Sequence, residues 1–423
     1  MDVMHERVGS LDVHQAMVVA CVRVQQGGVA SRECQTFGTT TAGLLALLAW
    51  LQAAGCTHVA MEATGVYWKP VWAILSDGNF ELILANAAHI KNLPGRKTDI
   101  NDAMWIADLL ASGLIRGSFV PDEPTAELRT LLRTRTQLVR EQNRHTQRIQ
   151  KTLETANIKL TSVVTDIMGL SGRRMIEAMI GGLRTPAKLA ELADRRLKAS
   201  PKELYDALHG RLSDHHRFLL RLHLQQYDAL KAAIAEIDAE LDAAISRMET
   251  EVAEGQATFR SLATLLCTIP GVGAHSATVI LSEIGMDMNR FPSAGHLVAW
   301  AGLCPGQNES AGKRKSSRLR KGAPWLKTML VQCAWAATRK KLSYYRAQFH
   351  RLRARSGAKQ AICAVAASML VAIYHMLKDG TEHRDLGAGH FDRLPTEIKA
   401  NRLVARLAKL GYEVELKPLQ QAA

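Results

Sequence analysis

Lys97-Thr98-Asp99-Ile100-Asn101-Asp102-Ala103 is the stretch around which the chain is organised. It places two carboxylates three residues apart at the start of a largely apolar run that extends to Leu114. On a helix, residues i and i+3 lie on one face, so Asp99 and Asp102 would present their oxygens to the same point. Acids in the first turn of a helix are also favoured by the helix dipole and by unpaired N–H groups. Helix capping therefore explains this pair as well as metal binding does.

Two further acids lie where strands would expose them. Asp12 occurs in Val8-Gly9-Ser10-Leu11-Asp12-Val13-His14, and Glu62 occurs in Val59-Ala60-Met61-Glu62-Ala63-Thr64-Gly65. Four carboxylates that converge from separate elements form a hard-oxygen site suited to Mg²⁺. A pair of such ions can activate a nucleophile and stabilise a leaving oxygen on phosphate. The sequence predicts a magnesium site that consists of Asp12, Glu62, Asp99 and Asp102.

The charge of the chain indicates a polyanionic partner. The 423 residues carry 54 Lys+Arg against 40 Asp+Glu, which gives a net charge of +14. Nucleic acid is the simplest partner for such a chain, and an anionic membrane surface is the alternative. The length favours two or three domains.

Cysteines and hydropathy indicate a cytoplasmic protein. The seven cysteines are odd in number and show no paired metal-ligand spacing, which argues against disulfides and zinc and favours buried free thiols. The first residues do not form a signal peptide. The uncharged runs 34–61 and 360–377 are too interrupted or too short for a membrane span, which needs roughly 20 apolar residues. We expect a soluble protein without a membrane partner.

The first 120 residues show alternating strand and helix patterns. The expected strands are 8–12, 17–22, 31–37, 57–61 and 80–86, and the expected helices are 40–54, 66–75 and the one from Asp99. This order predicts a mixed α/β sheet. It is also the order of an RNase H-like nuclease fold, in which acids lie on the first strand, near the end of the fourth strand and on a late helix.

The middle region reads as long helices. A basic row, equally a solvated face or a phosphate-contacting face, consists of Arg129, Arg133, Arg140, Arg144 and Arg148. Apolar residues keep 3-4 spacing from Tyr227 to Met248, which predicts a coiled coil or a long antiparallel hairpin. Such an element serves either dimerisation or reach within one chain.

A third region carries two nucleic-acid features. Ile269-Pro270-Gly271-Val272-Gly273 resembles a helix-hairpin-helix turn, whose N–H groups can hold a phosphate, although an ordinary helix corner has the same pattern. From Ser310 through Lys378 there is no acid, while Lys and Arg number 16, an excess larger than the whole-chain net charge of +14. Solvated faces mix charge signs, so this stretch favours a nucleic-acid surface. The expected contacts are Lys313, Arg314, Lys315, Arg318, Arg320 and Lys321.

The predicted organisation has four parts. Residues 1–122 form the α/β domain with the acids, 123–255 the helical coiled-coil region, and 256–380 a mostly helical C-terminal domain with the helix-hairpin-helix and a serine-containing loop over 302–313. Residues 381–423 form an appendage with one helix over 395–410. Aromatic residues within 325–349 are expected partly in the core and partly as stacking platforms for bases or sugars.

Together these motifs resemble a transposase family of bacterial insertion sequences called IS one-ten, related to the Piv/MooV DNA invertases. The resemblance covers about residues 6–375. Its first part, a RuvC-like module, is carried by the motifs of Asp12, Glu62 and Asp99/Asp102. Its second part, a transposase module, is carried by Ile269–Gly273, Ala299-Trp300-Ala301-Gly302-Leu303, Ser310-Ala311-Gly312-Lys313 and Lys321-Gly322.

The resemblance implies a chemistry. It implies a magnesium-binding D-E-D-D tetrad at Asp12, Glu62, Asp99 and Asp102, and a serine nucleophile that maps to Ser310. The family loop usually ends Ser-Gly-Gly, whereas this chain has Ser310-Ala311-Gly312, so Ser316 and Ser317 are the fallback nucleophiles.

The family also implies partners. They are DNA at the element ends and target, and a structured guide RNA encoded by the element. Strand exchange holds four DNA ends at once, so a homodimer or homotetramer in the bacterial cytoplasm, at the nucleoid, is expected.

Two alternatives remain open at the level of sequence. In the first, the acids hydrolyse DNA with water, as in a magnesium-dependent junction-resolving nuclease, and Ser310 is an ordinary loop residue. In the second, the chain binds RNA or DNA without catalysis. Covalent protein–DNA adducts and magnesium-dependent activity separate these readings.

Overall fold

The computed structural model describes residues 3–63, 65–85, 99–250, 252–253, 255–306, 308–310, 313–316, 318–320, 322–391 and 396–416. The chain divides into two compact units, Met1–Val120 and Pro121–Ala423, and each is described by itself. The basic segment 91–97 and residues Ala311, Gly312, Ser317 and Lys321 lie outside the described part.

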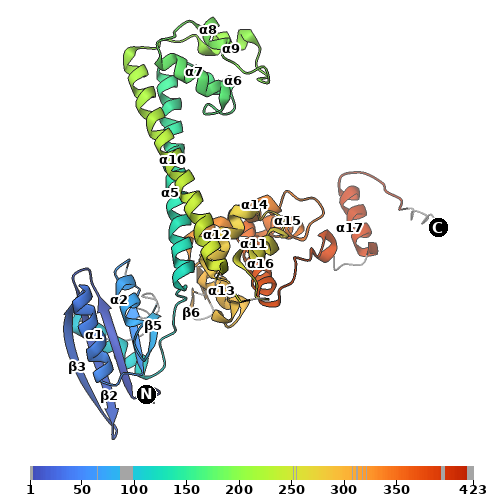
Figure 1. The fold of residues 1–423 in the computed structure, drawn as a ribbon. Helices are drawn as coiled ribbons and strands as arrows, with labels where there is room; N and C mark the ends of the chain where they lie inside the picture. The colour runs from blue at the N-terminus through green and yellow to red at the C-terminus, as the bar shows by residue number, and fades with distance from the viewer. Residues whose placement is uncertain are drawn as a thin grey trace. The chain divides into compact units, whose positions relative to one another are not determined.

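The first unit is built on a five-stranded mixed sheet, as the sequence predicts (Figure 1). Its strands are β1 (Arg7–Val13), β2 (Met17–Gln26), β3 (Val29–Gly38), β4 (His58–Glu62) and β5 (Glu81–Ala85). Their order is β3-β2-β1-β4-β5. β1, β2 and β3 are antiparallel neighbours, whereas β4 runs parallel to β1 and β5 runs parallel to β4.

Helices cover both faces of this sheet. α1 (Thr41–Ala53) and α2 (Trp68–Leu75) pack on the face that contains Leu11 and Met61. α4 (Asp99–Ala111) packs on the opposite face, which contains Val8 and Ala60. Successive strand residues point to opposite faces, so each inner strand is apolar on both sides. A polar residue on such a strand is therefore conspicuous.

A long helical pair begins the second unit. α5 (Glu123–Thr155) and α10 (Asp214–Thr250) run antiparallel along each other, with ion pairs Arg135–Asp238 and Arg247–Glu127 at matching positions (Figure 1). The described helices between them are α6 (Leu160–Val163), α7 (Leu170–Ile180), α8 (Pro186–Ala190) and α9 (Pro201–Leu208), which form a separate apolar cluster at one end of the pair. The structure thus pairs the heptad-like stripe of α10 within the same chain.

Two arginines of the basic row on α5 have a structural role. Arg133 forms two hydrogen bonds of 2.8 Å to the carboxylate of Glu283, and Arg129 donates to the backbone carbonyls of Ser282 and Glu283. The Glu283 side chain is only 2% exposed. Neither sequence interpretation of these two positions, a solvated face or a phosphate-contacting face, is correct, because both arginines are used inside the unit. Burial lowers the pKa of Arg129 to about 10.

A group of helices in the second unit packs on one apolar helix or on its direct neighbours. They are α11 (Phe259–Cys267), α12 (Ala274–Ile284), α13 (Ala294–Trp300), α14 (Pro324–Ala337), α15 (Tyr344–Ser356) and the central α16 (Ala358–Asp379). Short 3-10 helices lie at Met288–Arg290 and Ala388–Phe391. Within the described residues, α16 alone is long and apolar enough to cross a membrane, and half of its most apolar window is buried in the protein. Core helices of proteins can have the same length and apolar composition.

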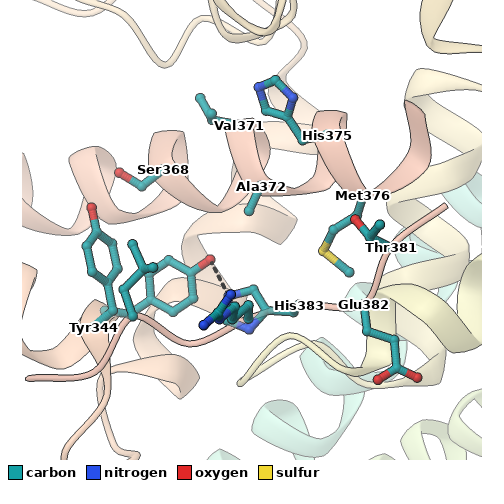
Figure 2. A pocket seen from close by; sticks show the side chains of 12 residues that line it. Tyr344, Ser368, Val371, Ala372, His375, Met376, Thr381, Glu382 and His383 are labelled. Carbon is teal, nitrogen blue, oxygen red and sulfur yellow. Dashed lines mark hydrogen bonds between the residues drawn. The ribbon is translucent and has the colours of Figure 1, made fainter. Parts of the chain in front are cut away.

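The chain after α16 packs back onto α15 before α17 (Thr396–Lys409) begins. The Tyr345 hydroxyl lies 3.2 Å from Nε2 of His383, and Asp385 accepts from the Tyr344 amide at 2.9 Å. Figure 2 shows the pocket of about 360 Å³ that this segment closes against His375 and Met376 of α16. Residues 381–391 are therefore part of the helical unit.

The cysteines form no disulfide. All seven thiols are free: Cys21, Cys34, Cys56, Cys267, Cys304, Cys333 and Cys363. Cys21, Cys56 and Cys333 are buried as expected, whereas Cys34 and Cys267 are exposed, so the expectation of burial is wrong for these two. Cys34 lies on β3, whose residues are mostly exposed, and this explains its position.

Candidate functional site

Two of the predicted acids lie side by side at the ends of parallel strands. Leu11 of β1 pairs in register with Met61 of β4, so Asp12 and Glu62 are the next residues on neighbouring strands. Asp12 pairs with Val19 and Glu62 with Ala85, and both partners pack in the cluster around α4. Cross-strand partners share a face of the sheet, so both carboxylates lie on the α4 side.

A buried hydrogen bond positions α4 over this face. Ser10 lies two residues before Asp12, on the same side of β1, and its hydroxyl donates to the carbonyl of Ala103 at 2.5 Å. Ala103 directly follows Asp102, so the first turns of α4 lie against the strand that carries Asp12. The predicted pair Asp99 and Asp102 does begin a helix, as expected. The side chain of Asp99 lies outside the described residues.

The environment of these acids is partly polar and partly buried. Oδ2 of Asp12 lies 3.1 Å from Nε2 of His14, and the Asp12 side chain is 17% exposed. Oδ1 of Asp102 is buried and has no hydrogen-bond partner among the described residues. A buried carboxylate oxygen without a donor is unfavourable unless a proton or a cation reaches it.

The donor chemistry of this face fits a hard cation. Asp12, Glu62 and Asp102 supply only oxygen atoms, the ligands that Mg²⁺ prefers, and the buried Oδ1 of Asp102 has no hydrogen-bond donor among the described residues that would compete with a cation. Within the described side chains, no group of three or more His, Cys, Asp or Glu is close enough to hold a metal ion. The fit therefore rests on donor type and on one shared face.

Asp108, another acid on α4, differs from Asp102 in having charged partners. Asp108 accepts hydrogen bonds from Arg23 at 3.0 Å and from Arg32 at 2.8 Å. Both arginines come from the antiparallel strands β2 and β3, so this carboxylate joins the helix to the sheet. Its charge is neutralised by protein groups, whereas the described surroundings of Asp102 offer no such cation. Asp108 is therefore structural.

The serine of the predicted loop lies on a short β-hairpin. β6 (Asn308–Ser310) pairs antiparallel with β7 (Lys313–Ser316), and Ser310 pairs with Lys313. The sequence predicts a loop here, and the structure replaces it with this hairpin. Further backbone contacts extend the pairing, since the Gly306 amide donates to Arg318 at 2.8 Å. We call residues 302–322 the hairpin arm.

Two glycines close the base of the hairpin arm. Gly302 has φ +71°, and a Cβ there would lie 2.8 Å from the carbonyl oxygen of Arg320. A Cβ on Gly322 would lie 2.4 Å from the amide nitrogen of Gly302. Only glycine permits such an approach of two backbones. The two ends of the arm are thereby held together beneath Ser310.

The predicted phosphate contacts are distributed along the second strand of the arm. Lys313, Arg318 and Arg320 are exposed, while the side chains of Arg314 and Lys315 lie outside the described residues. The hydroxyl of Ser316 accepts from the Arg318 amide at 3.1 Å, which gives this fallback serine a structural partner. The side chain of Ser310 itself is outside the described part. Ser310 belongs to the second unit and the acids to the first.

Sequence reasoning did not identify two positioning residues. Ser10 is a small polar residue two positions before Asp12 in an otherwise apolar strand, and this spacing could have identified it. Glu283 was visible as one acid within the apolar run of α12. Tyr345 and Phe349 are buried, as expected for the core members of the aromatic set, and Trp335 is 43% exposed. Base stacking by exposed aromatics stays a prediction.

Two protein-family profiles match the chain, one over the acids and one over the hairpin arm. A family profile described as Transposase matches residues 9–158, which contain the acids. A second profile, described as Transposase IS116/IS110/IS902 family, matches residues 263–350, which contain the hairpin arm.

Relatives carry related names. The chain is 27% identical over 303 residues to the 43.6 kDa protein of insertion element IS110 from Streptomyces coelicolor, with 68% of this chain and 72% of the relative covered. It is 27% identical over 305 residues to a candidate transposase of Sinorhizobium fredii, with 70% and 63% covered. It is also 34% identical over 119 residues to the transposase for insertion sequence element IS1328 of Yersinia enterocolitica, with 28% and 31% covered. On these matches, the chain belongs to the IS110 family of insertion-sequence transposases, the IS one-ten family that its motifs resemble.

Proposed function

We propose that this chain cuts and rejoins the DNA of an insertion sequence through a covalent link to Ser310. The observation that carries the proposal is the placement of Asp12, Glu62 and the first turns of α4 on one face of the sheet. The family membership supports the same activity. The strand order β3-β2-β1-β4-β5, with β4 and β5 parallel to β1, supports an RNase H-like, RuvC-like fold for the first unit.

In this proposal the four acids Asp12, Glu62, Asp99 and Asp102 hold Mg²⁺. The bound ion supplies Lewis-acid charge at the phosphate and favours ionisation of a nucleophilic hydroxyl. Ser10 keeps α4 seated on β1, so that Asp102 stays on the same face as Asp12. His14 holds the outer oxygen of Asp12.

Ser310 performs the covalent step. Its Oγ forms a bond to phosphorus while the bond from phosphorus to a sugar oxygen breaks; the serine gives up its proton and the leaving sugar oxygen takes one up. One phosphate ester replaces another, so rejoining the strands needs no external energy source. Lys313 and Arg318 are exposed on the hairpin arm and brace phosphate oxygens.

The partners follow from charge and from the chemistry. The stretch 310–378, which has no acid, binds DNA at the element ends and target, and an element-encoded structured RNA guides the choice of sites. Because strand exchange holds four DNA ends at once, subunits assemble as a homodimer or homotetramer in the bacterial cytoplasm, at the nucleoid.

A trapping assay tests this function. Purified protein is incubated with magnesium, the element's end DNA and its flanking transcript, and then denatured. We expect a protein–DNA adduct with the wild type, and no adduct with Ser310→Ala or Asp102→Ala. Cleavage that continues without any adduct, in the wild type and in Ser310→Ala, contradicts the serine mechanism.

Cleavage without a protein–DNA adduct favours a junction-resolving nuclease. The observation in its favour is that all the acids lie in the first unit and Ser310 in the second. In that case the acids activate water, and Ser310→Ala leaves hydrolysis unchanged.

A further inference from the structure

The covalent step proposed above does not use a groove in the helical unit. This groove lies between α5, α12 and α14 and has a volume of about 630 Å³. The residues that matter for its chemistry are Arg135, Arg140, Gly273, His275, Trp325 and Gln332. Small-molecule sites in proteins have volumes of roughly 300–1,000 Å³, so the groove is large enough for a nucleotide.

One end of the groove is the start of α12. Gly273 is the N-cap residue, in an extended conformation with φ −108°, and its amide donates to the Ser276 hydroxyl at 2.9 Å. The N–H groups of the following residues, Ala274 and His275, have no acceptor within their own helix. Gly273 is exposed, and a Cβ there would meet nothing within 4 Å. An anion can therefore reach these N–H groups, which point out of the positive end of the helix.

The other side of the groove is an aromatic platform covered by a cation. The guanidinium of Arg140 lies 5.2 Å from the centre of the Trp325 ring. Arg140 is exposed, and Trp325 is half-buried on the groove wall. Indole rings and guanidinium planes are the surfaces on which unpaired bases stack.

The charge of the groove is positive. Arg135 is neutralised by Asp238, to which it donates at 3.1 Å. No described acid pairs with Arg140. The helix α14 lies within the stretch 310–378, which carries no acid. The positive end of α12 and the guanidinium of Arg140, which lies over Trp325, are thus in one cavity.

We propose that this groove binds one unpaired nucleotide of a nucleic-acid strand, with its phosphate at the start of α12 and its base on the Arg140–Trp325 platform. A duplex does not satisfy both parts, because paired bases are stacked on each other and cannot reach an aromatic side chain. The chemistry is common to DNA and RNA. The site is independent of Asp12, Glu62, Asp102 and Ser310, so it stands or falls separately from the proposed function.

Binding to the full-length protein tests the proposal. Fluorescence polarisation measures the affinity for labelled 12-nucleotide dT and U strands and for a 12-base-pair duplex. Trp325→Ala should weaken binding of single strands by about fivefold or more, since one stacked base contributes roughly that much. Trp335→Ala is the matched control, because Trp335 is an exposed tryptophan on the same helix that does not line the groove. Arg140→Gln should lower the salt dependence by about one phosphate contact, whereas Lys151→Gln, farther along α5, should not.

A substitution series at Gly273 tests the phosphate end without removing a packed side chain. Gly273→Ala should bind like the wild type. Gly273→Asn occupies the free N–H groups and should bind more weakly, and Gly273→Asp adds a negative charge and should bind most weakly, by about fivefold or more. Asp and Asn are both good N-cap residues, so thermal unfolding should show that α12 is kept.

Each outcome decides the proposal. Stronger effects on the dT strand or on the U strand identify DNA or RNA as the source of the nucleotide. If Ala, Asn and Asp at position 273 bind equally, or if Trp325→Ala behaves like Trp335→Ala, the groove is not the site. If the duplex binds as tightly as single strands and loses as much affinity in the variants, an unpaired nucleotide is not the ligand. If Trp325→Ala does not fold, the Gly273 series decides alone.

Discussion

The Ser10 hydroxyl donates to the carbonyl of Ala103 at 2.5 Å, which joins the central strand of the first unit to the helix that carries Asp102. Ser10 is fully buried. The two residues are 93 positions apart in the chain. This contact sets where the helical acids lie relative to Asp12.

Ser10→Ala should therefore lower stability and activity together. The buried hydrogen bond contributes about 1 kcal/mol, and its loss leaves Asp102 less well positioned. Urea unfolding should show this loss, and adduct formation should fall. Ser31→Ala is the control, because the Ser31 hydroxyl makes only an exposed 3.4 Å contact to Val24, and it should change neither property.

Asp102→Asn should remove the response to magnesium. A ligand at 100 times its Kd stabilises a folded protein by about 2.7 kcal/mol, so the wild type should melt at a higher temperature in magnesium. The variant should lose most of that gain. Without metal it should be as stable as the wild type or more so, since an unpartnered buried charge is removed.

Asp108→Asn is the matched control on the same helix. It breaks the bonds to Arg23 and Arg32 and should lower stability, yet it should keep the magnesium-dependent gain in melting temperature. An equal loss of the magnesium response in both variants would contradict a specific role for Asp102.

Gly322→Ala should disable the hairpin arm while the helical unit stays folded. The added Cβ would lie 2.4 Å from the Gly302 amide nitrogen, so the base of the arm must open. We expect adduct formation to fall by about 100-fold, because displacements of about 1 Å cost that much at a reacting centre. Circular dichroism should remain unchanged. Gly306→Ala, whose Cβ would approach the Arg318 carbonyl only to 3.2 Å, should be milder.

Glu283→Ala should destabilise the second unit by about 3 kcal/mol. Its removal leaves Arg129 and Arg133 partly buried without their carboxylate, and breaking a buried pair on one side has a cost of this size. Thermal or urea unfolding measures the change. Glu236→Ala on the exposed face of α10 should have almost no effect, and a similar loss there would show that helix charge in general is responsible.

The α5–α10 pair should lose stability in mild acid. The rings of His145 and His223 lie 5.4 Å apart, and neither Nδ1 has a partner among the described residues. Burial lowers the pKa of both side chains, and Arg148 lowers it further. The unfolded chain takes up protons near pH 6.5 while the folded chain resists them, so stability is complete above about pH 6.5 and decreases as the pH falls toward the folded pKa values.

The double variant His145→Gln, His223→Gln isolates this effect. Its melting temperature should vary less between pH 7 and pH 5 than that of the wild type. An identical pH dependence in the two proteins would show that other groups are responsible.

Sequence patterns predicted the site best where an acid follows a run of buried apolar strand residues. Asp12 and Glu62 stand out because each ends an apolar strand, and parallel neighbours bring such ends together. The hairpin arm was not foreseen, because Lys313–Ser316 contains no apolar residue and so shows no strand alternation. Its pairing depends on backbone contacts and on the closely packed Gly302 and Gly322, which a pattern of hydrophobicity does not reveal.

Ion pairs between residues far apart in the chain also could not be predicted from the sequence. Arg133 and Glu283 are 150 positions apart, and nothing local to either distinguishes a buried pair from a solvated charge. The pattern of the basic row on α5 therefore predicts a surface, although its first two members bind Glu283 within the unit. Arg140, farther along the same row, is exposed to solvent.

The α5–α10 pair also has a mechanical consequence. α5 has 33 residues, so at 1.5 Å per residue the pair is about 50 Å long. Arg129 and Arg133 fasten one end of α5 to α12, and the cluster around Met175 and Leu204 lies at the other. A rotation of about 5° at the fastened end would move the far end by about 4 Å, given that length. A rigid pair of this length would convert small rearrangements beside Glu283 into displacements as large as the rise of two to three helical residues.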